Sequence, residues 1–478
     1  MCTMLNTYLI PWQRLGKPAG MILAFLLAFS SLAQKPRVFV LTDIENEPDD
    51  AMSYVRFLTY ANHFDIEGIV ATTSCWQRTK TAEWRLHEIT DAYAKVRDNL
   101  EKHEPGFPTA ASLHSMIKKG LPVFGKEGLG EGKDSEGSEW LVRAIQKNDP
   151  RPLYIQAWGG TNVLAQALWK LTKISTQAAV EAIVRKLRVY TISDQDNTGP
   201  WIREHFPSLS YIVSPGYQEN GGGQYHYATW SGISGDIFHG RFLGADTSIV
   251  RNEYLDVHVR KNHGPLGEKY PRIDYLMEGD TPSFLGLIQN GLNDPEHPDY
   301  GGWGGRYELC IPPFKKYMYA PETRPIWTDT QDEVYSDITK SYHTSNHATI
   351  WRWRTAFQHD FFARMDWCTA SYEEANHPPQ VRLDHNNLLT AKAGSEIRLS
   401  GLATDPDQDL VSYHWFFYPE VGTLNASEFR LKNAHQPTIT FIAPEVKEVK
   451  SMHFILEVTD DGTPALTRYQ RVIVNIQP

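Results

Sequence analysis

Short apolar runs alternate with longer amphipathic stretches from residue 36 to about residue 291. The runs RVFVL (37–41), IEGIVAT (66–72) and PLYIQAW (152–158) have the length and β-branched content of buried strands, and RVYTIS (188–193) and SYIVSP (210–215) repeat the pattern. Residues 51–63, 81–100 and 162–171 carry apolar side chains at helical spacing. Strands that alternate with helices form a parallel sheet covered by helices, so the pattern predicts an α/β fold.

The pattern changes after residue 376. From HPPQVRL (377–383) onward, short strands alternate with Thr, Asp-Pro and Asp-Gly turns and no helix is indicated. A segment of about 100 residues with this pattern predicts an immunoglobulin-like β-sandwich. We therefore expect an α/β domain over 34–376, closed by a helix in the aromatic run 350–367, and a sandwich over 377–478. The Asp-rich turns 405–409 and 459–462 are compatible with structural Ca²⁺ binding or with ordinary turns.

The N-terminus has the composition of a secretory signal. Arg14 and Lys17 precede the apolar run MILAFLLAF (21–29), and the small-residue stretch SSLAQ follows. This pattern predicts cleavage after Ala33 and a secreted or periplasmic protein. The run is shorter than the ~20 apolar residues of a spanning helix, so no membrane span is expected.

Composition narrows the class of partner. Of the 478 residues, 41% are hydrophobic and 22% charged, as in soluble globular proteins. The formal charge is −10, and about −12 without the basic signal segment, which argues against nucleic acid as a partner. Without Cys2 of the signal, Cys75, Cys310 and Cys368 form neither a zinc pattern nor a disulfide framework, and any pairing among them stays open.

The strongest candidate for chemistry is LTDIENEPDD (41–50), which places five carboxylates directly behind the first strand. Ligands bind at the carboxyl ends of the strands in an open α/β sheet. The dipole of the following helix stabilises an anion by only ~0.3 to 1 kcal/mol, too little for five charges. Either water around an exposed loop or a hard cation such as Ca²⁺ would relieve the crowding. Two further strand ends, WGGTN (158–162) and EGDTP (278–282), carry residues suited to the same site.

The order and spacing of DIENEPDD, WGGTN and EGDTP resemble the motifs of the nucleoside hydrolases. Together with GGWGGRYEL (301–309), they resemble more closely the secreted, nucleoside-hydrolase-like family first described as cellulose-binding proteins, whose members carry a C-terminal β-sandwich. The resemblance covers nearly the whole mature chain. It implies an open, mainly parallel sheet with flanking helices, followed by the immunoglobulin-like sandwich.

Carried over by position, the resemblance implies a Ca²⁺ site and a set of catalytic residues. The cation would be held by Glu45, Asp50, the Thr161 carbonyl and Asp280. Glu45 would be the base, and Asp49 would lie near the sugar. Glu278 is not part of the family's pattern; it lies next to Gly279, where many nucleoside hydrolases have a His, and is the candidate for the acid. Aromatic loops at 220–232 and 299–308 are suited to sugar faces, although core packing, capping and turn roles remain alternatives for their members and for 194–201. The predicted substrate-binding residues are Asp43, Asp49, Ser74, Asn162, Asp196, Asn197, Trp230 and Trp303.

Departures from the nucleoside hydrolase pattern indicate a different substrate. Glu45 stands in place of an Asp, Gly279 in place of a His, and ATTSCW (71–76) lacks an Asn. We therefore expect a secreted, Ca²⁺-dependent glycoside hydrolase that acts on a glycan or glycoside by attack of water at the anomeric carbon. The alternatives are a non-catalytic carbohydrate-binding (cellulose-binding) protein on a hydrolase fold and, ranked lower, a nucleoside hydrolase. The sequence leaves the sugar, the linkage, the stereochemical outcome and the oligomeric state open.

Overall fold

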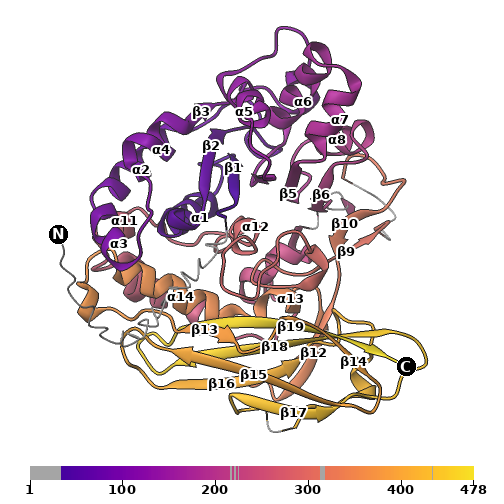
Figure 1. The fold of residues 1–478 in the computed structure, drawn as a ribbon. Coiled ribbons are helices and arrows are strands. Elements are labelled where there is room, and N and C mark those ends of the chain that lie inside the picture. The colour runs from indigo at the N-terminus through magenta and orange to yellow at the C-terminus, as the bar shows by residue number, and fades with distance from the viewer. Residues whose placement is uncertain (1–33, 216–217, 220–221, 224, 313–317, 433) are drawn as a thin grey trace, which may run out of the picture. The chain divides into compact units, whose positions relative to one another are not determined.

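An eight-stranded sheet organises the α/β part of the chain (Figure 1). Its strand order is β3-β2-β1-β4-β5-β6-β10-β9, and every neighbouring pair is parallel except β9, which runs antiparallel to β10. This arrangement confirms the predicted open, mainly parallel sheet. The strands are β1 (Arg37–Thr42), β2 (Asp65–Ala71), β3 (Ile117–Lys119), β4 (Leu153–Ala157), β5 (Leu187–Ser193), β6 (Ser210–Ser214), β9 (Tyr307–Cys310) and β10 (Ile326–Asp329).

Both faces of the sheet are buried, which explains why its strands are apolar along their whole length. In β1, Val38 and Val40 belong to one core and Phe39 and Leu41 to the other. Helices α1, α2 and α14 contribute to the first core, and α5, α6 and α7 to the second. The longer helices are α1 (Pro48–Thr59), α2 (Glu83–Ala94), α3 (Arg97–His103), α4 (Ala110–Met116), α5 (Glu136–Gln146), α6 (Asn162–Ile174), α7 (Gln177–Val184), α8 (Thr198–His205) and α14 (Arg354–Asp366).

Several helices differ in extent from the sequence prediction. Helix α1 begins three residues before the predicted 51 because Pro48, with its fixed φ, occupies its first turn. The stretch expected as one helix over 81–100 is divided into α2 and α3 by a turn at Lys95 and Val96. Short helices complete the set: α9 (Gly235–Phe238), α10 (Asn252–Leu255), α11 (Gly264–Glu268), α12 (Pro282–Leu285) and α13 (Ala348–Trp351).

The C-terminal part is the predicted all-β sandwich. One sheet has the order β13-β15-β17 and the other the order β14-β19-β18-β16. Alternate side chains of both sheets, among them Leu399, Trp415 and Val472, form a core of their own. The strands are β13 (Gln380–Leu383), β14 (Leu388–Lys392), β15 (Glu396–Thr404), β16 (Val411–Phe417), β17 (Thr438–Ile442), β18 (Lys450–Asp460) and β19 (Thr467–Gln477); a separate hairpin, β11 (Asp332–Ser336) and β12 (Ser341–Ser345), precedes them.

The sandwich packs on α13 and α14 (Figure 1). Tyr418, Ile455 and Tyr469 of the sandwich belong to the core of the α/β part, and the Tyr469 ring lies edge-on to Trp353 at 5.7 Å. Buried polar contacts cross the same junction, including the ion pair of Arg468 with Asp360 at 2.6 Å. Side chains of the sandwich thus complete part of the α/β core, beside the core within the sandwich itself.

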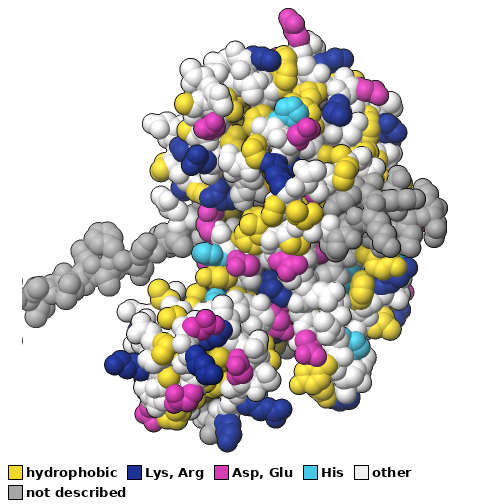
Figure 2. Space-filling model, turned by 90° about the vertical axis from the view of Figure 1, so that its right-hand side faces the viewer, with side chains coloured by type: hydrophobic (Ala, Val, Ile, Leu, Met, Phe, Trp, Pro, Cys, Tyr) yellow, Lys and Arg dark blue, Asp and Glu magenta, His cyan; other side chains and the backbone are white. Residues whose placement is uncertain are grey.

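The structure describes residues 34–215, 218–219, 222–223, 225–312, 318–432 and 434–478. The predicted signal segment, 1–33, lies outside these residues. Among the described helices, none combines the length and apolar character needed to cross a bilayer. Cys75, Cys310 and Cys368 are free thiols. On the face in Figure 2, Lys and Arg side chains are interspersed with Asp and Glu and do not gather into one basic surface.

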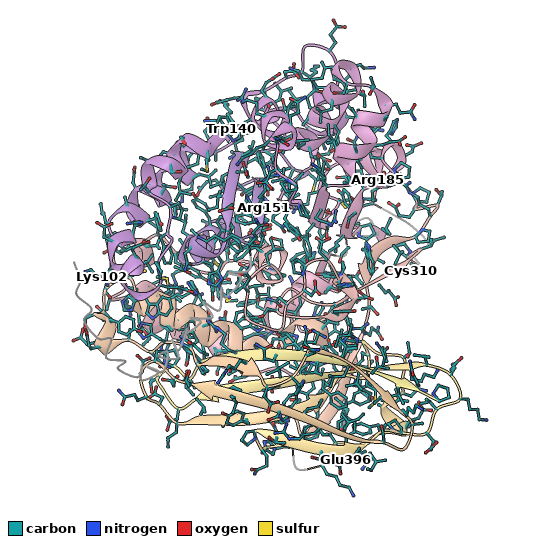
Figure 3. The ribbon with its side chains drawn as sticks, in the orientation of Figure 1. Lys102, Trp140, Arg151, Arg185, Cys310 and Glu396 are labelled. Carbon is teal, nitrogen blue, oxygen red and sulfur yellow. The ribbon has the colours of Figure 1, made fainter. Side chains whose placement is uncertain are left out.

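Ion pairs neutralise acidic groups at the amino ends of the central strands. Arg151, labelled in Figure 3, pairs with Asp149 at 2.7 Å and with Asp65 at 2.5 Å. Arg37 at the start of β1 pairs with Glu67 at 2.9 Å. At the carboxyl end of β1, by contrast, Asp49 and Asp50 have no such basic partner among the described residues.

Candidate functional site

The turn from β1 to α1 gathers the acidic side chains. Thr42, the last residue of β1, donates its hydroxyl to Asp50 and accepts from the Ile44 backbone N–H at 3.1 Å. Pro48 starts α1, so Asp49 and Asp50 lie in its first turn, where the helix dipole favours negative charge. The turn thus holds Asp50 beside the strand end rather than in solvent.

A third carboxylate reaches the same point from far along the chain. Asp280 lies just before α12, and oxygen atoms of Asp49, Asp50 and Asp280 lie within 4.8 Å of one another. Asp50 and Asp280 are 3% and 1% exposed. The Oδ2 atoms of Asp280 and of the neighbouring Asp43 are buried without a hydrogen-bond partner. Within the described residues, no ion pair reaches any of these four carboxylates.

Burial and mutual repulsion make these groups unusually weak acids. Burial, opposed by a hydrogen bond from Ser74, raises the pKa of Asp43 to about 7. Burial and the charges of Glu47 and Asp43 raise the pKa of Asp49 to about 8. Burial and the neighbouring carboxylates hold the pKa values of Asp50 and Asp280 well above the ordinary range. Each shift disfavours the charged form of these carboxyl groups, and a cation among them would oppose the shifts.

Aromatic side chains wall the pocket that contains these carboxylates. Its volume is about 240 Å³. Trp230 donates its ring N–H to Ser193 at 3.1 Å, which fixes the ring in the wall. Trp76 and Tyr275 are more than half exposed and stand at the mouth. The lining residues are Asp43, Asn46, Glu47, Asp49, Asp50, Trp76, Trp158, Ile192, Gln195, Tyr225, His226, Trp230, His239, Tyr275, Leu276 and Asp280.

Two predicted catalytic carboxylates do not line this pocket. Glu45 has φ of +72°, so its exposed side chain turns outward and pairs with Arg85 at 3.1 Å. Glu278, also at positive φ, is fully buried between Arg56 at 2.8 Å and the Tyr270 hydroxyl at 2.5 Å. The structure thus places Glu45 in a surface ion pair and Glu278 in a core ion pair, and their catalytic roles stay predictions that this arrangement does not favour.

Within the strand end WGGTN, Trp158 lines the pocket, whereas Thr161 and Asn162 do not. The Thr161 carbonyl, predicted to bind the cation, accepts the first backbone hydrogen bond of α6 from Ala165 at 2.9 Å. Asn162 ties the loops together through Thr73 at 3.1 Å and the Val123 carbonyl at 2.9 Å. Neither residue lines the pocket, and both have partners within the fold; their metal and substrate roles stay predictions.

Three further predicted substrate residues also have structural partners. Asp196 accepts from the Thr198 N–H at 2.8 Å and the Asn162 N–H at 3.1 Å, and so caps two helices. Asn197 accepts from the Lys126 N–H at 2.8 Å and lines a separate surface groove. Trp303 is fully buried and its ring lies 6.3 Å from Tyr469 at the sandwich. Asp196 thus has a capping role and Trp303 a core position in the fold, and the substrate roles of all three residues stay predictions.

Of the other substrate candidates, Asp43, Asp49 and Trp230 line the pocket together. Ser74 is buried one layer behind them, where its hydroxyl accepts from the backbone N–H groups of Trp76 and Gln77 at 3.1 Å each and hydrogen-bonds Asp43.

Comparison with known proteins identifies the family. The family described as "Cellulose-binding Sde182, nucleoside hydrolase-like domain" matches residues 37–307. The chain belongs to this family. Its companion, "Cellulose-binding protein Sde0182, C-terminal domain", matches residues 396–476.

Solved structures were compared as well. A nucleoside hydrolase-related hypothetical protein from Saccharophagus degradans, associated with carbohydrate metabolism, is 34% identical, with 93% of this chain and 100% of that chain covered and a TM-score of 0.76. The effector protein XOO4466 is 10% identical with a TM-score of 0.27, covering 62% of this chain and 87% of its own. The fibronectin(III)-like modules of Clostridium thermocellum CbhA are 14% identical with a TM-score of 0.14, covering 22% and 48%. No curated protein sequence matches the chain.

Several pocket residues of this Sde182 family member were missed by sequence reasoning. Trp76 directly follows the ATTSC stretch behind β2, and Tyr275 lies just ahead of EGDTP. Tyr225 and His226 belong to the aromatic loop 220–232, from which only Trp230 was chosen. Proximity to a strand end was the available signal for the first two. His239 had no comparable signal.

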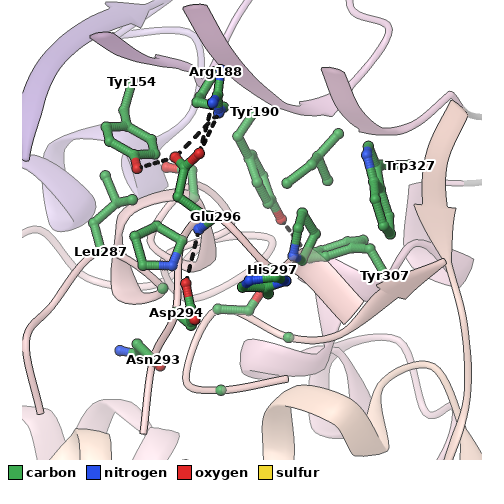
Figure 4. Close-up of a pocket in the computed structure, with 18 of the residues that line it drawn as sticks. Tyr154, Arg188, Tyr190, Leu287, Asn293, Asp294, Glu296, His297, Tyr307 and Trp327 are labelled. Carbon is green, nitrogen blue, oxygen red and sulfur yellow. Dashed lines mark hydrogen bonds and ion pairs between the residues drawn. The ribbon is translucent and has the colours of Figure 1, made fainter. Parts of the chain in front are cut away.

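A second, smaller pocket of about 110 Å³ lies on the amino-terminal half of β4 to β6. Figure 4 shows Tyr154 and Arg188 converging on the Glu296 carboxylate, at 2.6 Å each, with Tyr190, Tyr307 and Trp327 as walls. The glycine-rich segment predicted to face sugar, 299–308, lines this pocket instead of the acidic one. Its principal charges are paired with each other, so they do not call for a ligand.

Proposed function

We propose that this protein is a Ca²⁺-dependent glycoside hydrolase that acts on a glycan or glycoside. One observation carries the proposal: four aspartates, for which the described residues offer no basic partner, converge in a pocket walled by aromatic side chains. Carboxyl groups with perturbed pKa values, grouped in a pocket, are typical of catalytic sites. Tryptophan and tyrosine rings offer flat apolar faces to the C–H faces of sugar rings. The family's description as cellulose-binding supports a carbohydrate ligand.

The donor set fits a hard cation. Asp49, Asp50 and Asp280 offer only oxygen atoms, which Ca²⁺ prefers, and no cysteine or histidine completes their cluster. The unpartnered Oδ2 of Asp280 is a buried acceptor that a cation would satisfy. When bound, Ca²⁺ would supply positive charge that orients water and sugar hydroxyls. We assign these three aspartates as its protein ligands in place of Glu45 and Thr161.

The remaining polar residues suit proton transfer and sugar binding. Asp43 lines the pocket with an unpartnered buried oxygen, which suits a base that takes a proton from water. Burial lowers the pKa values of His226 and His239, so both imidazoles are neutral at pH 7. Each neutral ring offers a donor and an acceptor to sugar hydroxyls. Trp230 provides the stacking face.

A second candidate function is carbohydrate binding without catalysis. Glu278, the acid predicted from the sequence, is locked between Arg56 and Tyr270, and the described lining offers no glutamate other than Glu47 in its place. An inverting or retaining glycosidase uses two carboxyl groups on opposite sides of the sugar. The absence of Glu278 from the pocket lining is the observation that favours binding without catalysis.

The test compares Asp280→Asn with Glu45→Gln in the full chain. Sugar release from plant and microbial polysaccharides and binding to insoluble cellulose are measured with Ca²⁺ and after chelation. We expect Asp280→Asn and chelation to lower turnover on the order of 10²-fold or more, because the cation stabilises charge worth several kcal/mol. Glu45→Gln, on the same loop but paired outward with Arg85, serves as the matched control and retains turnover.

Each outcome separates the candidates. Turnover lost in Glu45→Gln as well as in Asp280→Asn contradicts the outward role of Glu45 and supports the role that the sequence predicts for it. Turnover kept in Asp280→Asn contradicts both ligand sets. Cellulose binding that survives chelation, with no sugar released from any substrate, supports the binding-only function. Base release from inosine or uridine supports a nucleoside hydrolase.

A further inference from the structure

A second acidic cluster lies in the sandwich, where the chain enters it from the α/β part. The loop between β15 and β16 carries Asp405, Asp407 and Asp409, whose oxygen atoms lie within 4.8 Å of one another. The end of β18 lies beside this loop, because Asp460 pairs in register with Val411. The Leu410 backbone N–H donates to the Asp461 carboxylate at 2.8 Å, which links the loop to the residue that follows β18.

Basic groups do not neutralise this cluster. Within the described residues, its one ion pair joins Asp407 to the His377 imidazole at 3.0 Å. The other ring nitrogen of His377 contacts the His103 ring at 2.9 Å, so both nitrogens are engaged. The side-chain atoms free to coordinate a cation at this position are therefore oxygen atoms.

Two buried oxygens beside the loop lack a hydrogen-bond donor. Asp460 is 4% exposed; its Oδ1 accepts from the N–H groups of Gly462 at 3.1 Å and Leu466 at 2.9 Å, whereas its Oδ2 is buried and accepts nothing. Asn376 is 7% exposed and its Oδ1 is also buried without a donor. Acceptors left in this state are costly, so each points to a ligand.

The orientation of Asn376 is fixed by its surroundings. Its amide nitrogen donates to Asp460 Oδ1 at 3.0 Å and to the Pro464 carbonyl at 2.8 Å. Exchanging the amide oxygen and nitrogen would set an oxygen against both of these acceptors. The charge of Asp405 adds to burial in raising the pKa of Asp460, which locates this carboxylate next to the loop acids.

We propose that Asp405, Asp407 and Asp409, whose oxygen atoms lie within 4.8 Å of one another, hold one Ca²⁺ ion at the entrance to the sandwich, beside the unpartnered oxygens of Asp460 and Asn376. The three carboxylates supply part of the six to eight oxygen ligands of Ca²⁺, and Asp460, Asn376 and water would supply the remainder. The engaged nitrogens of His377 and the absence of cysteine from the cluster disfavour zinc and copper.

Occupancy of the site would fix the connection between the two parts of the chain. Asn376 precedes β13, and its backbone carbonyl accepts from the Trp367 indole N–H at 2.9 Å at the end of α14. The Trp367 ring stacks on His103 at 5.3 Å and on His377 at 5.2 Å. A cation on Asn376 therefore joins the sandwich loops to the end of α14 through one residue.

The experiment uses the full mature chain, stripped with a chelator, and CaCl₂ as the probe. Asp280→Asn is the background, so that a site in the aspartate pocket does not contribute. Calorimetric titration should show one Ca²⁺ site in this background. Adding Asp409→Asn should weaken it by at least ~10-fold, the loss that even outer residues of a metal site cause when changed. The Asp409 side chain makes no described hydrogen bond, so this change removes a charged oxygen with little other effect.

Asp384→Asn is the matched control. This exposed aspartate of the same sandwich contacts Arg398 at 3.3 Å and should leave Ca²⁺ affinity unchanged. Limited proteolysis of the 370–380 segment should slow with Ca²⁺ in the background variant and in the control, but not with Asp409→Asn.

The result that overturns the proposal is an Asp280→Asn protein that binds no Ca²⁺, or an affinity that Asp409→Asn leaves unchanged. The first measurement needs no change in the sandwich, so it decides the matter even if Asp409→Asn fails to fold. Failure of the proposed function is distinguishable: wild type and Asp280→Asn would then bind Ca²⁺ equally, while Asp409→Asn would still lose it.

Discussion

At the scale of single residues, two glycines allow the carboxylates to pack so closely. A β-carbon built on Gly159 would lie 2.7 Å from the Asp43 Oδ1 atom, and one on Gly279 would lie 2.8 Å from Asp49 Oδ2 and 3.0 Å from the Trp230 ring. The sequence showed Gly279 only as a departure from the histidine of nucleoside hydrolases. The structure gives the reason: the backbone here touches both the acidic cluster and the aromatic wall, so no side chain fits.

We expect Gly279→Ala to weaken Ca²⁺ and carbohydrate binding together. The added methyl group must displace Asp49 or Trp230, at an overpacking cost of about 1–3 kcal/mol, equivalent to roughly a 5- to 150-fold loss of affinity if it acts on the bound form. Calorimetry with CaCl₂ and soluble oligosaccharides measures both effects. Gly286→Ala is the control, because its β-carbon would have no atom nearer than 3.8 Å. Equal affinities in wild type and Gly279→Ala would contradict the packing described here.

At the scale of elements, the acidic turn between β1 and α1 shows what sequence could and could not predict. Strand, turn and helix were predicted in order, and the buried strand placed the acids at the carboxyl end of the sheet. The direction of each side chain in the turn was not predictable, because side chains alternate regularly between two faces only along a strand. The positive φ of Glu45 turns it toward Arg85, and residue types alone do not reveal this torsion.

The same turn makes the stability of the cation-free protein depend on pH. The pKa values of Asp43 and Asp49, raised by burial to about 7 and about 8, lie above the ordinary value of about 4 in an unfolded chain. The folded protein therefore binds more protons than the unfolded chain between these limits, and its unfolding free energy falls as pH rises from about 4 to 8.

We expect the melting temperature of the chelated protein to decrease from pH 5 to pH 8, and Ca²⁺ to raise it more at pH 8 than at pH 5, because ligand carboxylates must lose their protons to bind. Thermal unfolding with CaCl₂ and with chelator at both values measures this. In Asp409→Asn, which removes a ligand of the proposed sandwich site, the difference between the two pH values should persist; in Asp280→Asn it should shrink. A melting temperature that rises steadily to pH 8 without cation contradicts the raised pKa values.

At the scale of the whole molecule, the sequence predicted two kinds of structure but not how they are joined. Changes of periodicity revealed the α/β part and the sandwich, and the aromatic run 350–367 was expected to be helical. That Tyr418 and Tyr469 of the sandwich enter the core of the α/β part was not visible, since their alternation along the strands is that of any half-buried sheet. The sequence also gives no sign that Arg468 pairs with Asp360, which lies 108 positions away.

The buried ion network at this junction should hold the two parts in one cooperative unit. Asp360 accepts from Arg468 of the sandwich at 2.6 Å, from Arg364 at 3.3 Å and from the Tyr60 hydroxyl at 2.7 Å. Asp360→Ala would leave both arginines without this buried partner, and we expect the unfolding free energy to fall by about 3–5 kcal/mol. Asp384→Ala, which removes an exposed contact with Arg398, should cost at most about 1 kcal/mol. Chemical denaturation followed by fluorescence and circular dichroism measures both. If Asp360→Ala costs no more than the control, the network does not stabilise the junction; if the two probes separate only in Asp360→Ala, the network is what couples the sandwich to the sheet.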